Sequence, residues 1–551
     1  KRARLEGARM HERTLAQQRK LTALLKNDHT LFGGVLIGLD GHVIEIQARA
    51  TGILKRPQPW RTAVSVTGMA RGSILESWDR ISGAFAKFRI PEPEVSIVIN
   101  LTPADLPKEG ALLDLPMAII ALQAAGILPD IKEVWESKYI LVGEVGLHGE
   151  IRRVPGILSI ALATEAGQNL IVPAGNEREC ALITAAVGHE KCAISAVSTL
   201  KEVIDFFGGK GELTNVLSQR VQFEDFIPRG TDIGSIKGQN RAKEAALIAA
   251  SGGHNLLLIG PPGEGKSLLA SAIPGILPRL SNEEIVELTR IYSAFGALDR
   301  DGMVVSRRPM RNIHHSASKQ SLVGGGSKLT KPGEITLSHL GVLFLDEIAE
   351  FSKSTLDSLR QPMEDGCVRI SRVGASVEYP CRFTLVAAMN PCPCGFYGDE
   401  LRCRCTEQEV KRYQKKISGP ILDRIDIQVD LKPLSADERF CETDQNLRRQ
   451  FRARVERARE RQNERYRGTK IPYNAAMPGA RIREFCQFTD EAFDNYRSII
   501  QENTLSTRAM DRIAKVSRTI ADLYDKDEIL ADHVARAASY VLKGSAKAVL
   551  Q

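Results

Sequence analysis

A chain of 551 residues is too long for one hydrophobic core, and its length predicts about three domains. The hydrophobic fraction of 43% and the charged fraction of 26% are ordinary for a soluble globular protein. The net charge of +8 permits a nucleic-acid partner without arguing for one, and no apolar run approaches the roughly 18 residues that a membrane span needs.

The N-terminal stretch is basic, with eight Lys or Arg and two Glu in residues 1–26. An exposed helical arm over residues 1–30 is the simpler interpretation, and an arm that binds nucleic acid or a partner is the alternative. No apolar segment follows the basic start, so we expect no secretory signal. Four of the ten cysteines crowd between Cys392 and Cys405, which fits a metal in a reducing interior better than disulfides, so we expect a cytoplasmic protein.

Residues 31–207 alternate between patterns typical of strands and of helices. Strands are expected at 35–38, 43–46 and 95–99, and helices at 115–126 and 158–167. The polar, glycine-rich stretch 208–224 predicts a linker.

Three segments of this region resemble the proteolytic domain of Lon proteases, and they lie at 100–110, 143–151 and 171–176. That family uses a Ser–Lys pair. After Lys108-Glu109-Gly110 the position of the serine holds Leu112, and no lysine stands near Leu158-Ser159-Ile160, where the family places its own. Without a nucleophile and a base there is no acyl chemistry. We therefore expect a Lon-like α+β domain that has no peptidase activity and serves assembly or substrate binding.

A phosphate-binding loop follows the apolar run 256–259, which predicts a buried parallel strand, and precedes a helical pattern from Leu268. Its residues are Gly260, Pro261, Pro262, Gly263, Glu264, Gly265, Lys266 and Ser267. The glycines let backbone N–H groups surround phosphate oxygens, Lys266 reaches the β- and γ-phosphates, and Ser267 binds Mg²⁺. The motif predicts a site for ATP with Mg²⁺.

Two more strands end in polar residues that complete such a site. Asp346 and Glu347 follow the strand expected at 342–345, where Asp346 can hold Mg²⁺ and Glu347 can polarise the attacking water. Alone, this pair is more often the start of a helix, but its place roughly 80 residues after a P-loop favours the catalytic interpretation. Asn390 follows the strand expected at 383–389 and resembles the sensor-1 residue of AAA+ ATPases, which orients that water.

Two unusual segments, 307–339 and 369–379, match the magnesium-chelatase-like branch of the AAA+ ATPases, which also resembles the minichromosome maintenance helicases. The second segment predicts a hairpin that turns near Gly374. In that branch both insertions project toward the pore of a ring. Five basic side chains would then meet DNA phosphates, namely Lys319, Lys328, Lys331, Arg369 and Arg372. Solvated loop charges are the alternative.

Cys392, Cys394, Cys403 and Cys405 form two Cys-x-Cys pairs separated by eight residues. Four thiolates at this spacing can close a tetrahedral, structural Zn²⁺ site, and free thiols are the alternative. The position directly after Asn390 suggests that the metal would fold a surface loop.

Arg424 resembles the arginine that related ring ATPases direct at a neighbouring subunit's γ-phosphate, where a cation stabilises transition-state charge. Beyond residue 433 the pattern turns helical. Residues 447–467 hold nine Arg and three Glu, which predicts a solvated helix face, with a DNA-facing ridge as the alternative. Arg508 lies in a segment that resembles the lid helix carrying a sensor-2 arginine, which acts in cis or in trans.

The order of these motifs resembles the ComM/YifB family of magnesium-chelatase-like proteins. We therefore expect a multidomain α/β chain: arm 1–30, Lon-like domain 31–207, linker 208–224, AAA+ parallel-sheet core 225–434 and helical lid 435–551. The resemblance implies a homo-hexameric, ATP-driven DNA motor that promotes branch migration during natural transformation, whereas residue chemistry alone supports a ring-forming Mg²⁺-ATPase. A magnesium-chelatase motor subunit is the alternative, although that enzyme has no Lon-like domain, and a Lon-type protease is disfavoured. The basic arm and the loose match over 62–88 depart from the family pattern.

Overall fold

The structure is a computed structural model that describes residues 18–68, 72–104, 106, 108, 110–129, 138–187, 192–216, 231–298, 304–325, 331–372, 375–440 and 442–542. The chain divides into two compact units. One contains Lys1–Phe223 together with Asn282–Val305, and the other contains Glu224–Ser281 together with Ser306–Gln551.

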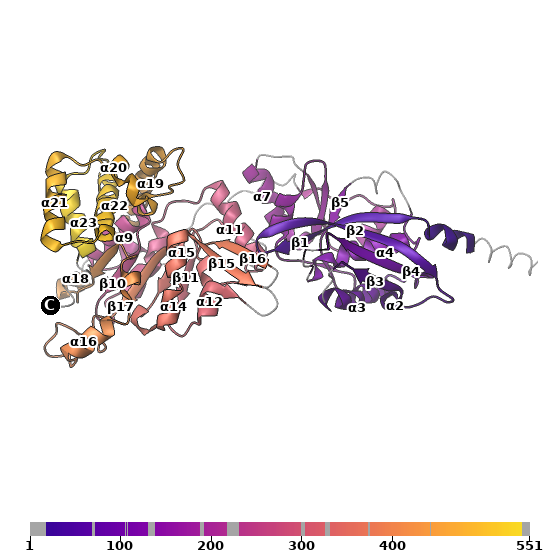
Figure 1. The fold of residues 1–551 in the computed structure, drawn as a ribbon, viewed down its shortest axis with the longest axis horizontal. Coiled ribbons are helices and arrows are strands. Elements are labelled where there is room, and N and C mark those ends of the chain that lie inside the picture. The colour runs from indigo at the N-terminus through magenta and orange to yellow at the C-terminus, as the bar shows by residue number, and fades with distance from the viewer. Residues whose placement is uncertain are drawn as a thin grey trace, which may run out of the picture. The chain divides into compact units, whose positions relative to one another are not determined.

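The first unit is built on a seven-stranded mixed sheet in the order β3-β4-β2-β1-β5-β8-β9 (Figure 1). Its strands are β1 (Asp28–Ile37), β2 (Asp40–Ile53), β3 (Val64–Thr67), β4 (Val95–Thr102), β5 (Tyr139–Leu141), β8 (Asn169–Pro173) and β9 (Ala193–Val197). β1 and β2 form an antiparallel hairpin much longer than the two short strands expected there, and β2 pairs antiparallel with β4. The remaining neighbours are parallel. A separate short hairpin joins β6 (Glu144–Val145) to β7 (Ile151–Arg152).

The helices of this unit from the first part of the chain include α2 (Trp60–Ala63), α3 (Gly72–Lys87), α4 (Asp114–Ala124), α6 (Ile157–Ala163), α7 (Glu177–Val187) and α8 (Leu200–Phe207). Two of them, α3 and α4, supply much of the core. Every residue of α4 is buried, as expected for a helix that is apolar on nearly all sides. α3 instead buries one stripe formed by Trp78, Ile81 and Phe85. α6 is shorter than the helix expected at 158–167, because Thr164 already has an extended backbone.

The first unit also contains a helix from a distant part of the chain, α11 (Asn282–Ala294), which packs on α6 and α7. The buried hydroxyl of Ser293 donates a hydrogen bond to the carboxylate of Glu179. Arg290 forms an ion pair with Asp40, the first residue of β2. The stretch that the sequence assigns to one continuous ATPase core is therefore interrupted by a segment that packs elsewhere.

The second unit is built on a five-stranded parallel sheet in the order β11-β14-β17-β10-β18. Its strands are β10 (Leu256–Ile259), β11 (Met310–Ile313), β14 (Val342–Leu345), β17 (Thr384–Met389) and β18 (Ile427–Asp430). β14 and β17 are buried along their whole length, which explains their continuous apolar sequences. Because parallel strands all run the same way, the residues after β10, β14 and β17 leave the sheet at one carboxyl edge, where ligands of such folds bind. The three strands expected at these positions are confirmed.

Helices and two hairpins surround this sheet. The helices are α9 (Asn240–Gly252), α10 (Lys266–Ala272), α12 (Lys319–Val323), α13 (Glu334–Leu337), α14 (Lys353–Asp357), α15 (Arg360–Asp365), α16 (Glu407–Gln414), α17 (Gly419–Leu422) and α18 (Ala436–Phe440). The hairpins are β12 (Gly324–Gly325) with β13 (Lys331–Pro332), and β15 (Cys367–Arg372) with β16 (Ala375–Pro380). The second hairpin is the one expected around residue 374.

The C-terminal region is helical, as predicted, and Figure 1 shows its helices grouped together. They are α19 (Leu447–Arg465), α20 (Ile482–Phe485), α21 (Asp490–Asn503), α22 (Thr507–Leu523) and α23 (Ala531–Val541). α19 and α22 pack on α9, and one apolar cluster contains Leu258 of β10, Val455 of α19 and Ile513 of α22. The helical region and the parallel sheet therefore share a core. Among the helices that the structure describes, none combines the length and the apolarity that a membrane crossing requires.

Candidate nucleotide site

The P-loop connects β10 to α10 at the carboxyl edge of the parallel sheet. Gly263 and Gly265 have φ angles of 83° and 85°, and no atom lies within 4 Å of a Cβ built on either residue. Backbone conformation, rather than crowding, therefore requires glycine at both positions. A loop with such left-handed turns can direct several backbone N–H groups at one centre, which is how phosphate is bound.

Side chains from three strand ends meet beside this loop. The ammonium group of Lys266 donates to the side-chain oxygen of Asn390 at 3.0 Å and to the carbonyl of Gly260 at 2.6 Å. The hydroxyl of Ser267 donates to the Asp346 carboxylate at 2.9 Å. Asn390 follows β17 and Asp346 follows β14, so the strand register brings both to the P-loop. The structure thus brings together four of the residues that the sequence predicts for ATP and Mg²⁺.

The chemistry of this cluster fits a nucleotide with its magnesium ion. Hydroxyl and carboxylate oxygens, such as those of Ser267 and Asp346, are the hard ligands that Mg²⁺ prefers. Lys266 is half-buried, and this burial is the main cause that lowers its pKa, while the negative charges of Asp346, Glu264 and Glu347 oppose the shift. Its ammonium donates to loop carbonyls, so phosphate oxygens can take over those hydrogen bonds.

Glu347 lies next to this cluster in a left-handed conformation, with φ 51° and ψ 50°, which is uncommon for a residue with a side chain. Such conformations gather at functional sites. Its carboxylate lies 3.4 Å from Nδ1 of His315, whose ring packs against that of His314 with centroids 4.0 Å apart. Sequence reasoning assigned His315 no role. The signal that could have found it is its place two residues beyond β11, the strand that pairs with β14.

Arg424 lies at the opposite edge of the sheet from the P-loop of its own chain. Its carbonyl accepts a hydrogen bond of 2.8 Å from the side chain of Asn255, the residue directly before β10. The four residues of β10, a length of about 13 Å, separate Asn255 from Gly260. The Arg424 guanidinium donates to the Pro420 carbonyl at 2.5 Å, and it also donates to the Glu364 carboxylate. Arg424 is therefore not part of its own chain's nucleotide cluster.

Arg508, near the start of α22, shares the same carboxylate. Its guanidinium lies 3.8 Å from Glu364, and 60% of its side chain is exposed. Arg512, one turn later, donates to the carbonyl of Ile425 at 2.6 Å and ties α22 to the loop that carries Arg424. The two arginines predicted to reach a γ-phosphate are thus held together at the amino edge of the sheet.

The four cysteines after Asn390 gather into one cluster. The sulfur atoms of Cys392, Cys394, Cys403 and Cys405 all lie within 4.8 Å of one another. Cys392 Sγ is 3.3 Å from that of Cys394 and 3.9 Å from that of Cys403. These separations exceed a disulfide bond of about 2.05 Å, and they bracket the value of about 3.8 Å expected between thiolates around tetrahedral zinc. The geometry suits a closed metal site with four thiolate ligands.

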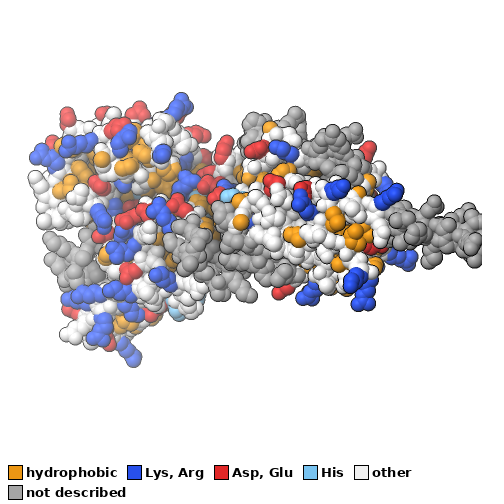
Figure 2. All heavy atoms as spheres, turned by 45° about the vertical axis from the view of Figure 1, so that its right-hand side comes forward, with side chains coloured by type: hydrophobic (Ala, Val, Ile, Leu, Met, Phe, Trp, Pro, Cys, Tyr) orange, Lys and Arg blue, Asp and Glu red, His pale blue; other side chains and the backbone are white. Residues whose placement is uncertain are grey.

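The basic residues predicted to contact DNA are only partly described. Lys319 begins α12 and is exposed, and Arg369 on β15 forms an exposed ion pair of 2.7 Å with Glu378 across the hairpin. The remaining three predictions fall outside the described part: the whole of Lys328, and the side chains of Lys331 and Arg372. On the face drawn in Figure 2, Lys and Arg are interspersed with Asp and Glu.

The arginine-rich helix α19 is held by contacts within the chain. Its ion pairs include Arg448–Asp232, Arg452–Glu456, Arg457–Asp525, Arg461–Asp527 and Arg465–Asp522. Arg459 donates to the carbonyl of Ala250 at 3.2 Å and lies over the ring of Tyr473. These partners favour a structural role for the helix over a DNA-facing ridge.

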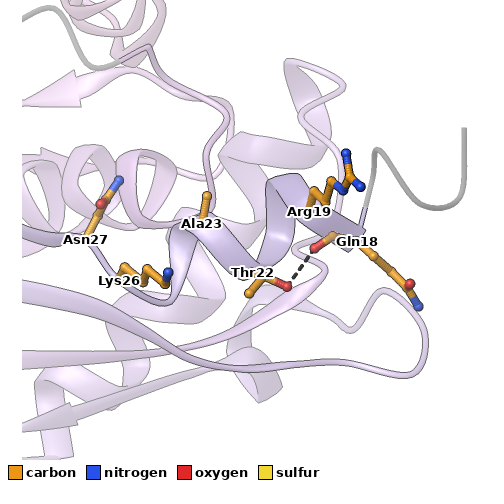
Figure 3. Close-up of a pocket in the computed structure, with 6 residues that line it drawn as sticks. All are labelled: Gln18, Arg19, Thr22, Ala23, Lys26 and Asn27. Carbon is orange, nitrogen blue, oxygen red and sulfur yellow. Dashed lines mark hydrogen bonds between the residues drawn. The ribbon is translucent and has the colours of Figure 1, made fainter. Parts of the chain in front are cut away.

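A hollow at the surface of the first unit lies on one short segment. It is lined by Gln18, Arg19, Thr22, Ala23, Lys26 and Asn27 (Figure 3). The Thr22 hydroxyl donates to the Gln18 carbonyl at 2.8 Å, an ordinary bond within a helix. Among these lining residues two are basic and none is acidic, so the hollow offers no carboxylate that could bind the Mg²⁺ of the predicted nucleotide site.

Three family models match the chain. Magnesium chelatase, subunit ChlI, matches residues 232–439; its C-terminal model matches 447–541; and the model for subunit ChlI of Mg-chelatase matches 58–176. The chain is 41% identical over 485 residues to the "Uncharacterized protein YifB" of Escherichia coli, covering 87% of this chain and 91% of that protein. It is 38% identical over 483 residues to the "Competence protein ComM" of Haemophilus influenzae, covering 86% of this chain and 91% of that protein. The "Magnesium-chelatase 38 kDa subunit" of Cereibacter sphaeroides is 26% identical over 175 residues, covering 28% of this chain and 52% of that protein.

These matches extend over both units, and the two relatives with higher identity cover most of the chain. The parallel sheet, with its P-loop at the carboxyl edge and a helical C-terminal region, agrees with a magnesium-chelatase-like AAA+ fold. The chain belongs to the ComM/YifB family of magnesium-chelatase-like AAA+ proteins.

Proposed function

We propose that this protein is a ring-forming, Mg²⁺-dependent ATPase motor that acts on DNA, with branch migration in natural transformation or recombination as its task. The observation that carries the ATPase is the pair of contacts Lys266–Asn390 and Ser267–Asp346, which join three strand ends. The DNA step is supported by the family, in which a relative 38% identical is named a competence protein.

Each residue of the cluster has a role that follows from its chemistry. Lys266 binds the β- and γ-phosphates, and Ser267 and Asp346 hold the metal. Glu347 takes the proton of the attacking water, and Asn390 orients that water. Mg²⁺, when bound, neutralises charge on the phosphates. The protein contributes position and charge, which is what phosphoryl transfer requires of it.

Arg424 and Arg508 act on the nucleotide of the neighbouring subunit. Their place at the amino edge supports this assignment, because an arginine there is separated from its own P-loop by the length of β10. A ring joined head to tail brings unlike surfaces of neighbouring subunits together, so one subunit's arginines can meet the next subunit's nucleotide. Glu364 pairs with both guanidinium groups in the isolated chain, and phosphate oxygens would replace it. We propose a homo-hexamer on the family pattern.

Two further assignments belong to the same proposal. The four cysteines bind a structural Zn²⁺, supported by the mutual distances of their sulfur atoms. The first unit is a Lon-like domain without peptidase activity. Leu112 is buried at the family's serine position, and Ser159, near the lysine position, is buried and accepts a hydrogen bond of 3.2 Å from Arg290.

DNA contacts are proposed for the two insertions, through Lys319 and Arg369 together with Lys328, Lys331 and Arg372. The Arg369–Glu378 pair is exposed at both ends, so solvent screens it and phosphate can compete for the guanidinium. This part of the proposal predicts a salt-dependent affinity for DNA.

A three-way junction assay tests the motor. Purified protein, with Lys266→Ala as the inactive control, is mixed with a labelled junction in the presence and absence of ATP. We expect ATP-dependent strand movement by the unmodified protein and faster ATP hydrolysis when DNA is present. Intact ATP hydrolysis without any strand movement would overturn the DNA step and leave the ATPase standing.

A magnesium-chelatase-type motor subunit is the second candidate, because all three matching family models describe magnesium chelatase. The similarity to such a subunit covers only 28% of this chain, which counts against it. ATP hydrolysis that ignores DNA but drives Mg²⁺ insertion into a porphyrin with partner subunits would favour this candidate.

A further inference from the structure

The loop that carries the cysteine cluster is held next to Asn390, the residue after β17, both at its start and through the helix that follows it. Cys392 follows Asn390 by two residues, and residues 392–405 contain no helix or strand. α16 begins directly after Cys405 with a capping box between Thr406 and Glu409. The other end of α16 returns to the start of the loop, where Gln414 donates to the Pro391 carbonyl at 3.1 Å.

The same loop touches the P-loop through its backbone. Gly395 has a φ of 86°, and a Cβ built there would lie 2.7 Å from Cδ and 2.9 Å from Cγ of Pro262. No side chain fits between the two loops at this point. The cysteine loop therefore contacts the P-loop and carries on its flank Asn390, the side chain that binds Lys266.

We infer that the metal held by the four cysteines is a positioning element of the nucleotide site, which keeps Asn390 and Pro262 in place for hydrolysis. This inference rests on the ATPase and the zinc site proposed above. A stretch of irregular chain has many conformations, and four bonds to one Zn²⁺ remove most of them. Because Asn390 orients the attacking water, loosening the loop slows hydrolysis more than it weakens nucleotide binding.

The ligand variant Cys403→Ser tests this coupling, since it removes a thiolate thirteen positions from Asn390 in the sequence. We expect zinc loss and a decrease in kcat of about tenfold, with ATP affinity changed by no more than about threefold. Cys403→His supplies another zinc ligand and should recover both zinc and most of kcat. Cys192 lies in the first unit, so Cys192→Ala is the matched control and should change neither the zinc content nor kcat.

Metal removal from the folded, unmodified protein gives an independent measurement. A chelator should lower kcat, and added ZnCl₂ should restore it, with the melting temperature recorded to exclude unfolding. Cobalt substitution should give the absorption spectrum of a tetrahedral thiolate site. A protein that contains no zinc and takes up no cobalt would overturn the metal site and this inference together.

Combining Cys403→Ser with Asn390→Ala shows whether the metal acts through this asparagine. If it does, Cys403→Ser should cost little further activity in the Asn390→Ala background, because the effects of coupled residues are not additive. Fully additive losses would overturn the coupling through Asn390, and zinc loss with unchanged kcat would overturn the whole inference. Neither result would contradict the proposal that the four cysteines bind zinc in the unmodified protein. Failure of the ATPase proposal is distinct, since the unmodified, zinc-loaded protein would then hydrolyse no ATP.

Discussion

Glu347 combines an uncommon backbone conformation with a carboxylate directed toward an imidazole. Its left-handed φ of 51° sets the side chain at the end of β14, and Nδ1 of His315 lies 3.4 Å from it. A general base gains from a neighbour that fixes its orientation. The pair is therefore the place where single substitutions should separate nucleotide binding from hydrolysis.

Glu347→Gln should retain ATP binding and lower kcat by at least about 100-fold, because the amide cannot accept the proton of water. His315→Ala should have a smaller effect, of about tenfold on kcat, since the carboxylate remains but loses its contact. ATP affinity by calorimetry and steady-state hydrolysis check both. Normal turnover by Glu347→Gln would show that the water-activation assignment is wrong.

Asp114, at the start of α4, is an ionisable residue buried in the first unit. Its carboxylate pairs with Arg80 at 2.8 Å, yet burial raises the pKa of Asp114 to about 6, outweighing the hydrogen bonds from Ser77 and Arg80 that lower it. In the unfolded chain an aspartate has a pKa of about 3.9. Between these values the folded protein binds more protons than the unfolded chain, so the contribution of Asp114 to stability falls as pH rises.

Asp114→Asn should remove this pH dependence. Relative to the variant, the unmodified protein should lose about 1 kcal/mol of stability between pH 5 and pH 7.5. Melting temperatures of both proteins at the two pH values measure the difference. Parallel melting temperatures across this range would mean that Asp114 does not titrate within it.

At the scale of elements, α11 shows how the two compact units share the chain. It follows α10 in sequence but completes the first unit, where it packs on α6 and α7. Its contacts there are specific as well as apolar: Ser293 donates to Glu179 and accepts from the Gly156 N–H at 3.1 Å. α11 is thereby built into the first unit, although residues 273–281 before it belong to the second.

Ser293→Ala should destabilise the first unit by about 1–3 kcal/mol, because the buried Glu179 carboxylate loses a donor. A lower melting temperature measures this loss. Ser498→Ala, at an exposed position of α21, is the matched control and should leave the melting temperature nearly unchanged. Equal melting temperatures for both variants would show that the docking of α11 does not depend on this hydroxyl.

At the scale of the whole molecule, the proposed nucleotide site needs residues from two subunits. Lys266 and Arg424 lie at opposite edges of the same sheet. If the proposed ring forms, each site combines the P-loop of one subunit with the arginine of the next.

Mixing two inactive variants tests this shared site. Lys266→Ala and Arg424→Ala should each be inactive alone, but an equal mixture should recover up to about a quarter of the unmodified rate, because about a quarter of random interfaces combine an intact lysine with an intact arginine. Steady-state ATP hydrolysis measures the recovery. A mixture as inactive as its parts, with ring assembly shown by mass, would contradict a site shared between neighbouring subunits.

Much of the second unit could be predicted from sequence because its signals are local. The P-loop at 260–267 depends on residue types within eight positions, and two of its glycines, Gly263 and Gly265, do adopt left-handed backbone conformations. β10, β14 and β17 were recognisable as apolar runs, since a strand buried on both faces carries few polar side chains. The strand ends then indicated which polar residues would share an edge.

The sequence by itself determined the family, the phosphate-binding loop and the polar residues at the strand ends, because each is encoded in a short run of neighbouring residues. Only the tertiary structure decided that α11 leaves the ATPase core, that His315 faces Glu347 and that Arg424 lies away from its own P-loop. The closure of four sulfur atoms around one centre was likewise decided by folding. These features depend on contacts between residues far apart in the chain. Such contacts are set by tertiary packing, and a short sequence pattern does not predict them.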